Sequence, residues 1–99
     1  MIRGTTPTLD FSLPFGTEQL AEAYVTIVQN GIVVIDKSLQ QCILEDNVIT
    51  IKLTQEETLQ LQCQYIAEAQ IRAKTIYGEV IASNVMRIPV ERILKDGVI

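Results

Sequence analysis

The chain has 99 residues, a formal net charge of −4 and an isoelectric point near 4.6, a length that predicts one domain, residues 1–99, with a single core. Its eight basic residues are scattered, so we do not expect the concentrated basic surface that nucleic-acid binding requires. No apolar stretch approaches the roughly 20 residues of a membrane-spanning helix, so we expect no membrane segment.

Seven segments carry strand signals, either alternating polarity or a high content of β-branched and aromatic residues. Turn-forming stretches separate most of them at intervals of about 8–12 residues, which is the pattern of a β-sandwich. In chain order, the segments are residues 8–13, 23–29, 32–36, 38–44, 48–53, 65–75 and 80–90.

The first half of the chain contains an alternating strand and a hairpin. Leu9, Phe11 and Leu13 fall on one face of the first strand, and we expect that face to be buried. Asn30 and Gly31 lie between two apolar strands, and this pair favours a type I′ turn because both residues readily adopt positive φ. We therefore predict a two-residue hairpin at this point.

The second half contains the one predicted helix. The run from Thr54 to Glu57 fits the capping box, in which Thr54 accepts from the Glu57 amide and Glu57 accepts from the Thr54 amide. We expect one or two helical turns over residues 55–61. Because the segment is short, it is a crossing between two sheets rather than a layer of its own.

These elements predict an all-β fold, an immunoglobulin-like antiparallel β-sandwich of about seven strands with a short helical crossing near residues 55–61. The antibody markers are absent, because the chain has no Trp and its two cysteines, Cys42 and Cys63, do not fall on the expected facing strands. We expect both thiols to be reduced and largely buried, although a disulfide and an eighth strand remain open alternatives. Residues 1–7 and 90–99 are candidate terminal arms.

Residue types that carry chemistry are scarce. The chain has no histidine, which removes the usual triads and the commonest transition-metal ligand. Turn and helix-start chemistry explain the acidic pairs Glu45/Asp46 and Glu56/Glu57. We predict a protein that is not an enzyme and has no catalytic, cofactor-binding or metal-binding residues. Tyr77, at a predicted turn, is the one exposed contact residue that we expect, the alternative being a hairpin residue that packs sideways.

Four segments of the chain resemble known proteins: IRGTTPTLDFSLPF (residues 2–15), QNG (29–31), LTQEETL (53–59) and ERILKDGVI (91–99). Together they are similar to small structural proteins encoded in tailed phages and prophages of Gram-positive gut bacteria. The alternating first strand and the hairpin are also similar to the immunoglobulin-like N-terminal domain of phage upper baseplate proteins. This resemblance implies a structural component of the tail, baseplate or neck, made in the host cytoplasm and assembled in many copies into the virion.

Partners follow from the same resemblance: other virion proteins and further copies of the chain. A mean hydropathy of +0.23 fits a self-association surface, or equally a surface rich in uncharged polar residues. The edges of a sandwich can serve assembly by strand addition or by docking a terminal arm. The alternative is a small module that binds a ligand or a host protein. For ligand binding, Tyr24, Tyr65 and Tyr77 would have to gather on one exposed face.

Overall fold

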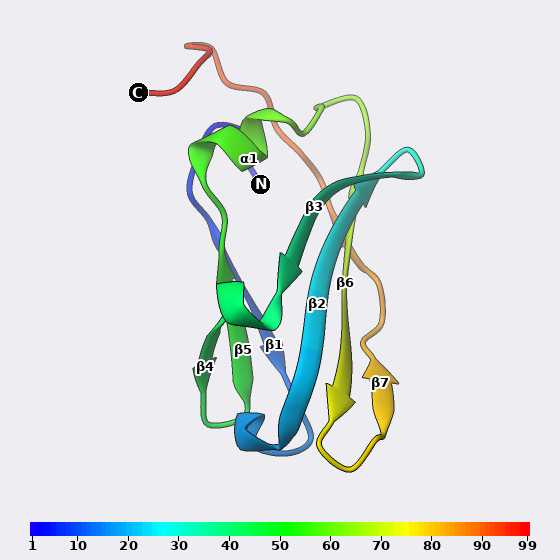
Figure 1. Cartoon of the computed structure of the whole chain (residues 1–99). Helices are drawn as coiled ribbons and strands as arrows, with labels where there is room; N and C mark the ends of the chain where they lie inside the picture. The colour runs from blue at the N-terminus through cyan, green and yellow to red at the C-terminus, as the bar shows by residue number, and fades with distance from the viewer.

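Eight strands and one short helix make up the computed structural model, which describes residues 1–99 (Figure 1). The strands are β1 (Thr8–Ser12), β2 (Leu20–Gln29), β3 (Ile32–Ser38), β4 (Ile43–Glu45), β5 (Val48–Lys52), β6 (Ala67–Thr75), β7 (Val80–Ala82) and β8 (Met86–Ile88). The helix is α1 (Gln55–Leu59), and two 3₁₀ turns, η1 (Thr17–Gln19) and η2 (Leu39–Gln41), lie in the connections.

The strands form two antiparallel sheets. One has the order β1-β5-β4, and the other has the order β3-β2-β6-β7, with β8 also paired to β6. Immunoglobulin sandwiches place strands B, E and D in one sheet and C, F and G in the other. Here β1, β5 and β4 take the places of B, E and D, while β2, β6 and the β7–β8 segment take those of C, F and G. The predicted immunoglobulin-like sandwich is therefore confirmed.

The last predicted strand, residues 80–90, is broken in the structure, and this break accounts for the eighth strand. The Arg72–Ala82 pair and the Ala69–Met86 pair are three residues apart along β6 but four residues apart along the segment that joins β7 to β8. The extra residue makes a β-bulge at residues 83–85. At this bulge, the Ile71 amide donates to the Ser83 hydroxyl at 3.1 Å.

The core lies between the sheets and follows the predicted alternation. Ile49 and Ile51 of β5 are fully buried against Val25 and Ile27 of β2, while β6 contributes alanines to the same layer. Small side chains on β6 leave room for the branched side chains opposite, so the two sheets can pack closely. Phe11 of β1 is also buried, as predicted.

The predicted turn and helix start are confirmed in detail. Asn30 and Gly31 have φ values of 49° and 75°, as a type I′ turn requires. The Glu57 amide donates to Thr54 Oγ1 at 3.1 Å, and the Thr54 amide donates to Glu57 Oε1 at 2.9 Å. The helix ends at Leu59, earlier than residue 61, and β4 is shorter than the predicted strand 38–44 because η2 occupies its first part.

A candidate assembly surface at the open seam

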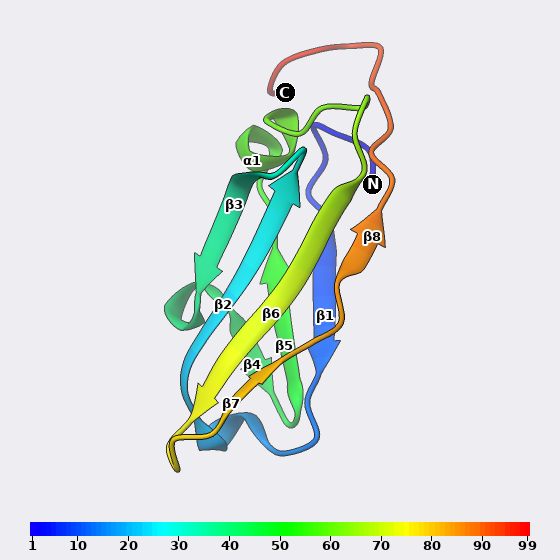
Figure 2. The ribbon, with the colours of Figure 1, turned by 90° about the vertical axis from the view of Figure 1, so that its right-hand side faces the viewer.

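Along one long side of the sandwich, β1 and the bulged β7–β8 segment belong to different sheets and do not pair with each other, and we call this side the open seam (Figure 2). β1 is an edge of one sheet, and β7 lies at an edge of the other. Between them lies a groove of about 500 Å³. Most of its lining is apolar, with Phe11, Leu13, Ile71, Ile81, Val85 and Met86 as the main contributors.

Unpaired backbone groups border the groove on the β1 side. Toward β5, the Leu13 amide donates to the Asn47 carbonyl at 2.8 Å, and the Leu53 amide donates to the Pro7 carbonyl at 3.0 Å. In an antiparallel pair, alternate residues direct their backbone groups to opposite sides of the strand. The N–H and C=O groups that face the open seam are therefore those of Thr8, Asp10 and Ser12.

The β7 side carries the same kind of free edge. Toward β6, the Thr75 amide donates to the Glu79 carbonyl at 2.8 Å, and the Ser83 amide donates to the Ile71 carbonyl at 2.9 Å. By the same alternation, the residues between them direct their N–H and C=O groups away from β6. These residues are Val80 and Ala82. The groove thus lies between two strand edges that can each accept a new strand.

Charge in the seam is confined to one residue. Asp10 is the only ionisable side chain that lines the groove, and it lies on the exposed face of β1. Its carboxylate accepts a hydrogen bond of 2.6 Å from the Thr50 hydroxyl. The arrangement suits an extended chain that places apolar side chains inward and a basic side chain beside Asp10.

The opposite long side is protected by a buried charge. Lys37 faces inward on edge strand β3, with 11% of its side chain exposed, and its Nζ lies 2.7 Å from Glu57 Oε2. Partial burial tends to raise the pKa of the Glu57 carboxyl, but the hydrogen bonds from Lys37 and Thr54 and the charge of Lys37 outweigh this effect. The pKa of Glu57 is therefore lowered.

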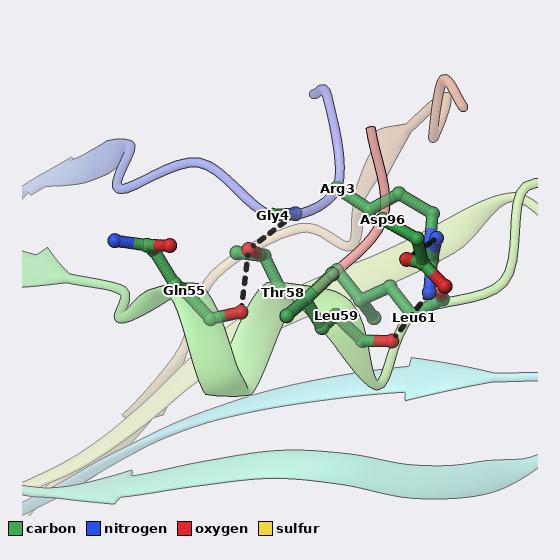
Figure 3. A network of polar contacts seen from close by, with 7 residues as sticks. All are labelled: Arg3, Gly4, Gln55, Thr58, Leu59, Leu61 and Asp96. Carbon is green, nitrogen blue, oxygen red and sulfur yellow. Dashed lines mark hydrogen bonds and ion pairs between the residues drawn. The ribbon is translucent and has the colours of Figure 1, made fainter. Parts of the chain in front are cut away.

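The N-terminal candidate arm, residues 1–7, lies against its own helix (Figure 3). The Arg3 guanidinium donates to the Leu59 carbonyl at 2.8 Å and to the Leu61 carbonyl at 2.9 Å. The Gly4 amide donates to the hydroxyl of the fully buried Thr58 at 2.9 Å. Cationic donors at the C-terminal end of a helix satisfy carbonyls that lack helical partners. This segment is held by its own domain.

The C-terminal candidate arm, residues 90–99, is attached only in part. Val90 is buried, and the Glu91 amide donates to the Met1 carbonyl at 2.7 Å. Beyond Glu91 no helix or strand forms. Leu94 and Ile99 are 91% and 90% exposed, more than any other large apolar side chain of the structure. We call residues 92–99 the C-terminal segment.

Tyr77 lies at the turn between β6 and β7 and is 75% exposed. Tyr24 and Tyr65 are about half exposed. However, Tyr24 pairs with Arg72, seven positions along the chain from Tyr65, so about 23 Å of strand separates these two side chains. The three tyrosines therefore do not gather on one face.

Both cysteines are free, but the expectation that both are largely buried is wrong for Cys63. Cys63 is exposed in the loop that follows α1, whereas Cys42 is half-buried before β4. Burial raises the pKa of the Cys42 thiol, and the charge of Lys37 offsets only part of this rise. No three side chains of the types His, Cys, Asp and Glu are grouped so as to hold a metal ion.

The sequence pattern predicted the inward face of β1 but not the open seam, because the seam depends on the bulge. The one available signal was the polar pair Ser83-Asn84 inside an otherwise apolar segment.

A search of protein-family models finds no match, and a search of curated proteins finds no significant relative. The one α-helix, α1, has five residues, too few for a membrane-spanning helix.

Proposed function

We propose that this protein is a non-enzymatic structural component of a phage or prophage virion, in the tail, baseplate or neck. It is made in the host cytoplasm and becomes part of the virion by protein–protein assembly. Its partners are other virion proteins and further copies of itself. The four segments that resemble phage structural proteins motivate the location, and the surface of the domain supports assembly as its mode of action.

The open seam is the observation that carries this proposal. Free strand edges are sites where another chain can pair, and proteins that do not use them cover or blunt them. Here two free edges flank a groove whose lining is mostly apolar. Such a groove favours an extended polypeptide over a small polar ligand, because backbone pairing and apolar contacts act together.

The experiment that tests the proposal is a protein inventory of purified particles. Particles are induced from a lysogen that encodes the chain, banded by density and digested for quantitative mass spectrometry. We expect the chain in a fixed ratio to the major tail protein, consistent with a ring of defined symmetry. Absence of the chain from particles that contain every other tail component would overturn the proposal.

A second candidate function is a small module that binds a ligand or a host protein. Tyr77 favours it, since an aromatic side chain that is 75% exposed at a hairpin tip is a common contact residue. A pull-down from host lysate with the wild-type chain and with Tyr77→Ala distinguishes the two functions. Capture of one host protein that depends on Tyr77, together with absence from particles, would favour the second candidate.

A further inference from the structure

We infer that the open seam binds the C-terminal segment of a second copy as an added β-strand. This inference deepens the proposed function and rests on it, since it names the contact by which copies of the chain assemble. The argument combines the backbone groups of the seam, the state of residues 92–99, one pair of opposite charges and the direction in which the segment leaves its own domain.

The seam requires an extended occupant. The free backbone groups of Thr8, Asp10 and Ser12 repeat at the spacing of a β-strand, so only an extended backbone can pair with all of them. Phe11 and Leu13 face the groove between these positions. An occupant therefore gains both a hydrogen-bond ladder and apolar contact.

The C-terminal segment has the properties of such an occupant. It has no regular structure of its own, and its eight residues span about 26 Å when extended, which exceeds the roughly 17 Å of the five-residue β1. Leu94 and Val98, which fall on the same face of an extended strand, are 91% and 55% exposed in the isolated chain. Insertion into the groove would remove apolar surface from water on both partners.

Charge and alternation set the register. Successive residues of a strand point to opposite faces, so Leu94 and Lys95 cannot share a face. With Leu94 directed into the groove, Asp96 and Val98 share its face, while Lys95 and Ile99 lie on the outer face, where Asp10 is the one charged side chain of the seam. Directly opposed residues of unlike charge stabilise a strand pair, and like charges destabilise it.

The donor is a second copy because the segment leaves its own domain in the wrong direction. Ile2 bridges to Glu91 in parallel, and the Arg3 amide donates to the Glu91 carbonyl at 3.1 Å. This pairing directs the chain past the α1 end of the domain, away from its own groove, as Figures 1 and 2 show.

Beyond Ile93, which is half-buried close to Gly4, only exposed contacts hold the segment in its present position. The Gln55 side chain exchanges hydrogen bonds of 2.9 and 3.1 Å with the Ile99 backbone, and Arg3 pairs with Asp96 at 3.3 Å. Water competes with such surface bonds, so the segment can be released to a neighbour at little cost.

The first test is the substitution Leu94→Ser, with the mass in solution measured by light scattering at two concentrations about a hundredfold apart. We expect the wild-type chain to form oligomers and Leu94→Ser to weaken them about tenfold or more, without a change in melting temperature. Ile32→Ser is the matched control, since it removes another exposed apolar side chain, on edge strand β3 at the opposite side of the sandwich. Loss of oligomers in the control alone would overturn the inference.

The second test reverses the charges. Asp10→Lys and Lys95→Asp should each weaken association, while the double variant, or an equimolar mixture of the two single variants, should restore it. Single variants that associate like wild type, or a double variant that does not recover, would contradict the predicted pairing of Asp10 with Lys95.

The outcomes separate this inference from the proposed function. A wild-type chain that remains at 11.1 kDa at both concentrations but is found in purified particles overturns the inference and leaves the structural function intact. A chain that forms oligomers through Leu94 but is absent from particles supports the inference and overturns the location in the virion.

Discussion

The two long sides of the sandwich treat their strand edges in opposite ways. On the β3–β4 side, β3 carries an inward-facing lysine and a bulge near Val34, and β4 is only three residues long. Inward charges, bulges and short strands all discourage pairing with another chain. On the β1–β7 side, β7 is also short and bulged, but β1 is a regular five-residue edge that borders an apolar groove. The β1 edge is therefore the one regular strand edge that carries none of these features.

On the protected side, an ion pair with Glu57 stabilises the buried charge of Lys37. Lys37 occupies an inward position of β3, where an unpaired ammonium would be costly, and Glu57 of α1 supplies its partner at 2.7 Å. The same carboxylate completes the capping box with Thr54. One residue thus connects the helix start to the edge strand, whereas the open seam has no such bridge between its sheets.

The largest expected effect comes from the floor of the open seam. Phe11→Ala removes a buried aromatic ring that lines the groove. We expect the free energy of unfolding, measured by urea denaturation, to fall by about 3 kcal/mol. Phe11→Leu, the conservative control, should lose less than about 1.5 kcal/mol. A loss below about 1 kcal/mol for Phe11→Ala would mean that Phe11 contributes little to the core.

On the protected side, Glu57→Gln should have a smaller effect, about 1–3 kcal/mol. The glutamine keeps an acceptor for the capping box, so the loss reports the unpaired charge of Lys37, which is mostly buried. Asp96→Asn is the matched control, because its partner Arg3 also binds two carbonyls and Asp96 is exposed. Equal stability losses in the two variants would contradict a special role for the buried pair.

Local signals predicted much of this fold. The alternation of Phe11 and Leu13, the Asn30-Gly31 turn and the Thr54 capping box each depend on residues close in sequence, and each is present as predicted. The intervals between turns were enough to indicate two sheets and a sandwich. Such features are readable because their stabilising contacts lie within a few residues of one another.

The bulge and the arm contacts depend on contacts far along the chain and were not predicted. At the bulge, the Ser83 hydroxyl accepts from the Ile71 amide, a geometry that exists only after β6 has paired. Arg3 binds carbonyls more than fifty residues away, at Leu59 and Leu61. A polar residue in a strand pattern does not reveal which backbone group it will meet, so the open seam became visible only in the structure.

The pH dependence of stability reports on the Glu57–Lys37 pair of the protected side. The pKa of the Glu57 carboxyl is lowered in the folded state. As pH falls, this carboxyl is therefore protonated in the unfolded chain before it is protonated in the folded chain. The stabilisation that ionised Glu57 provides is therefore complete above the pH range in which an ordinary carboxyl titrates. It disappears as pH falls through the folded-state pKa of Glu57. We expect the stability gap between wild type and Glu57→Gln to narrow between about pH 6 and about pH 3. A constant gap over this range would contradict the lowered pKa.

The smallest expected effect leaves stability unchanged and concerns the two thiols. Cys42 lies beside the protected edge, where burial raises its thiol pKa and its Sγ donates to the Ser38 carbonyl at 3.2 Å, whereas Cys63 is exposed. Because the thiolate is the reactive form, a disulfide reagent near neutral pH should modify Cys63 first and Cys42 at least about tenfold more slowly. Cys63→Ser should remove the fast phase and leave the slow one. Equal rates would mean that the chain between η2 and β4 opens readily, and that this side is less protected than its buried lysine indicates.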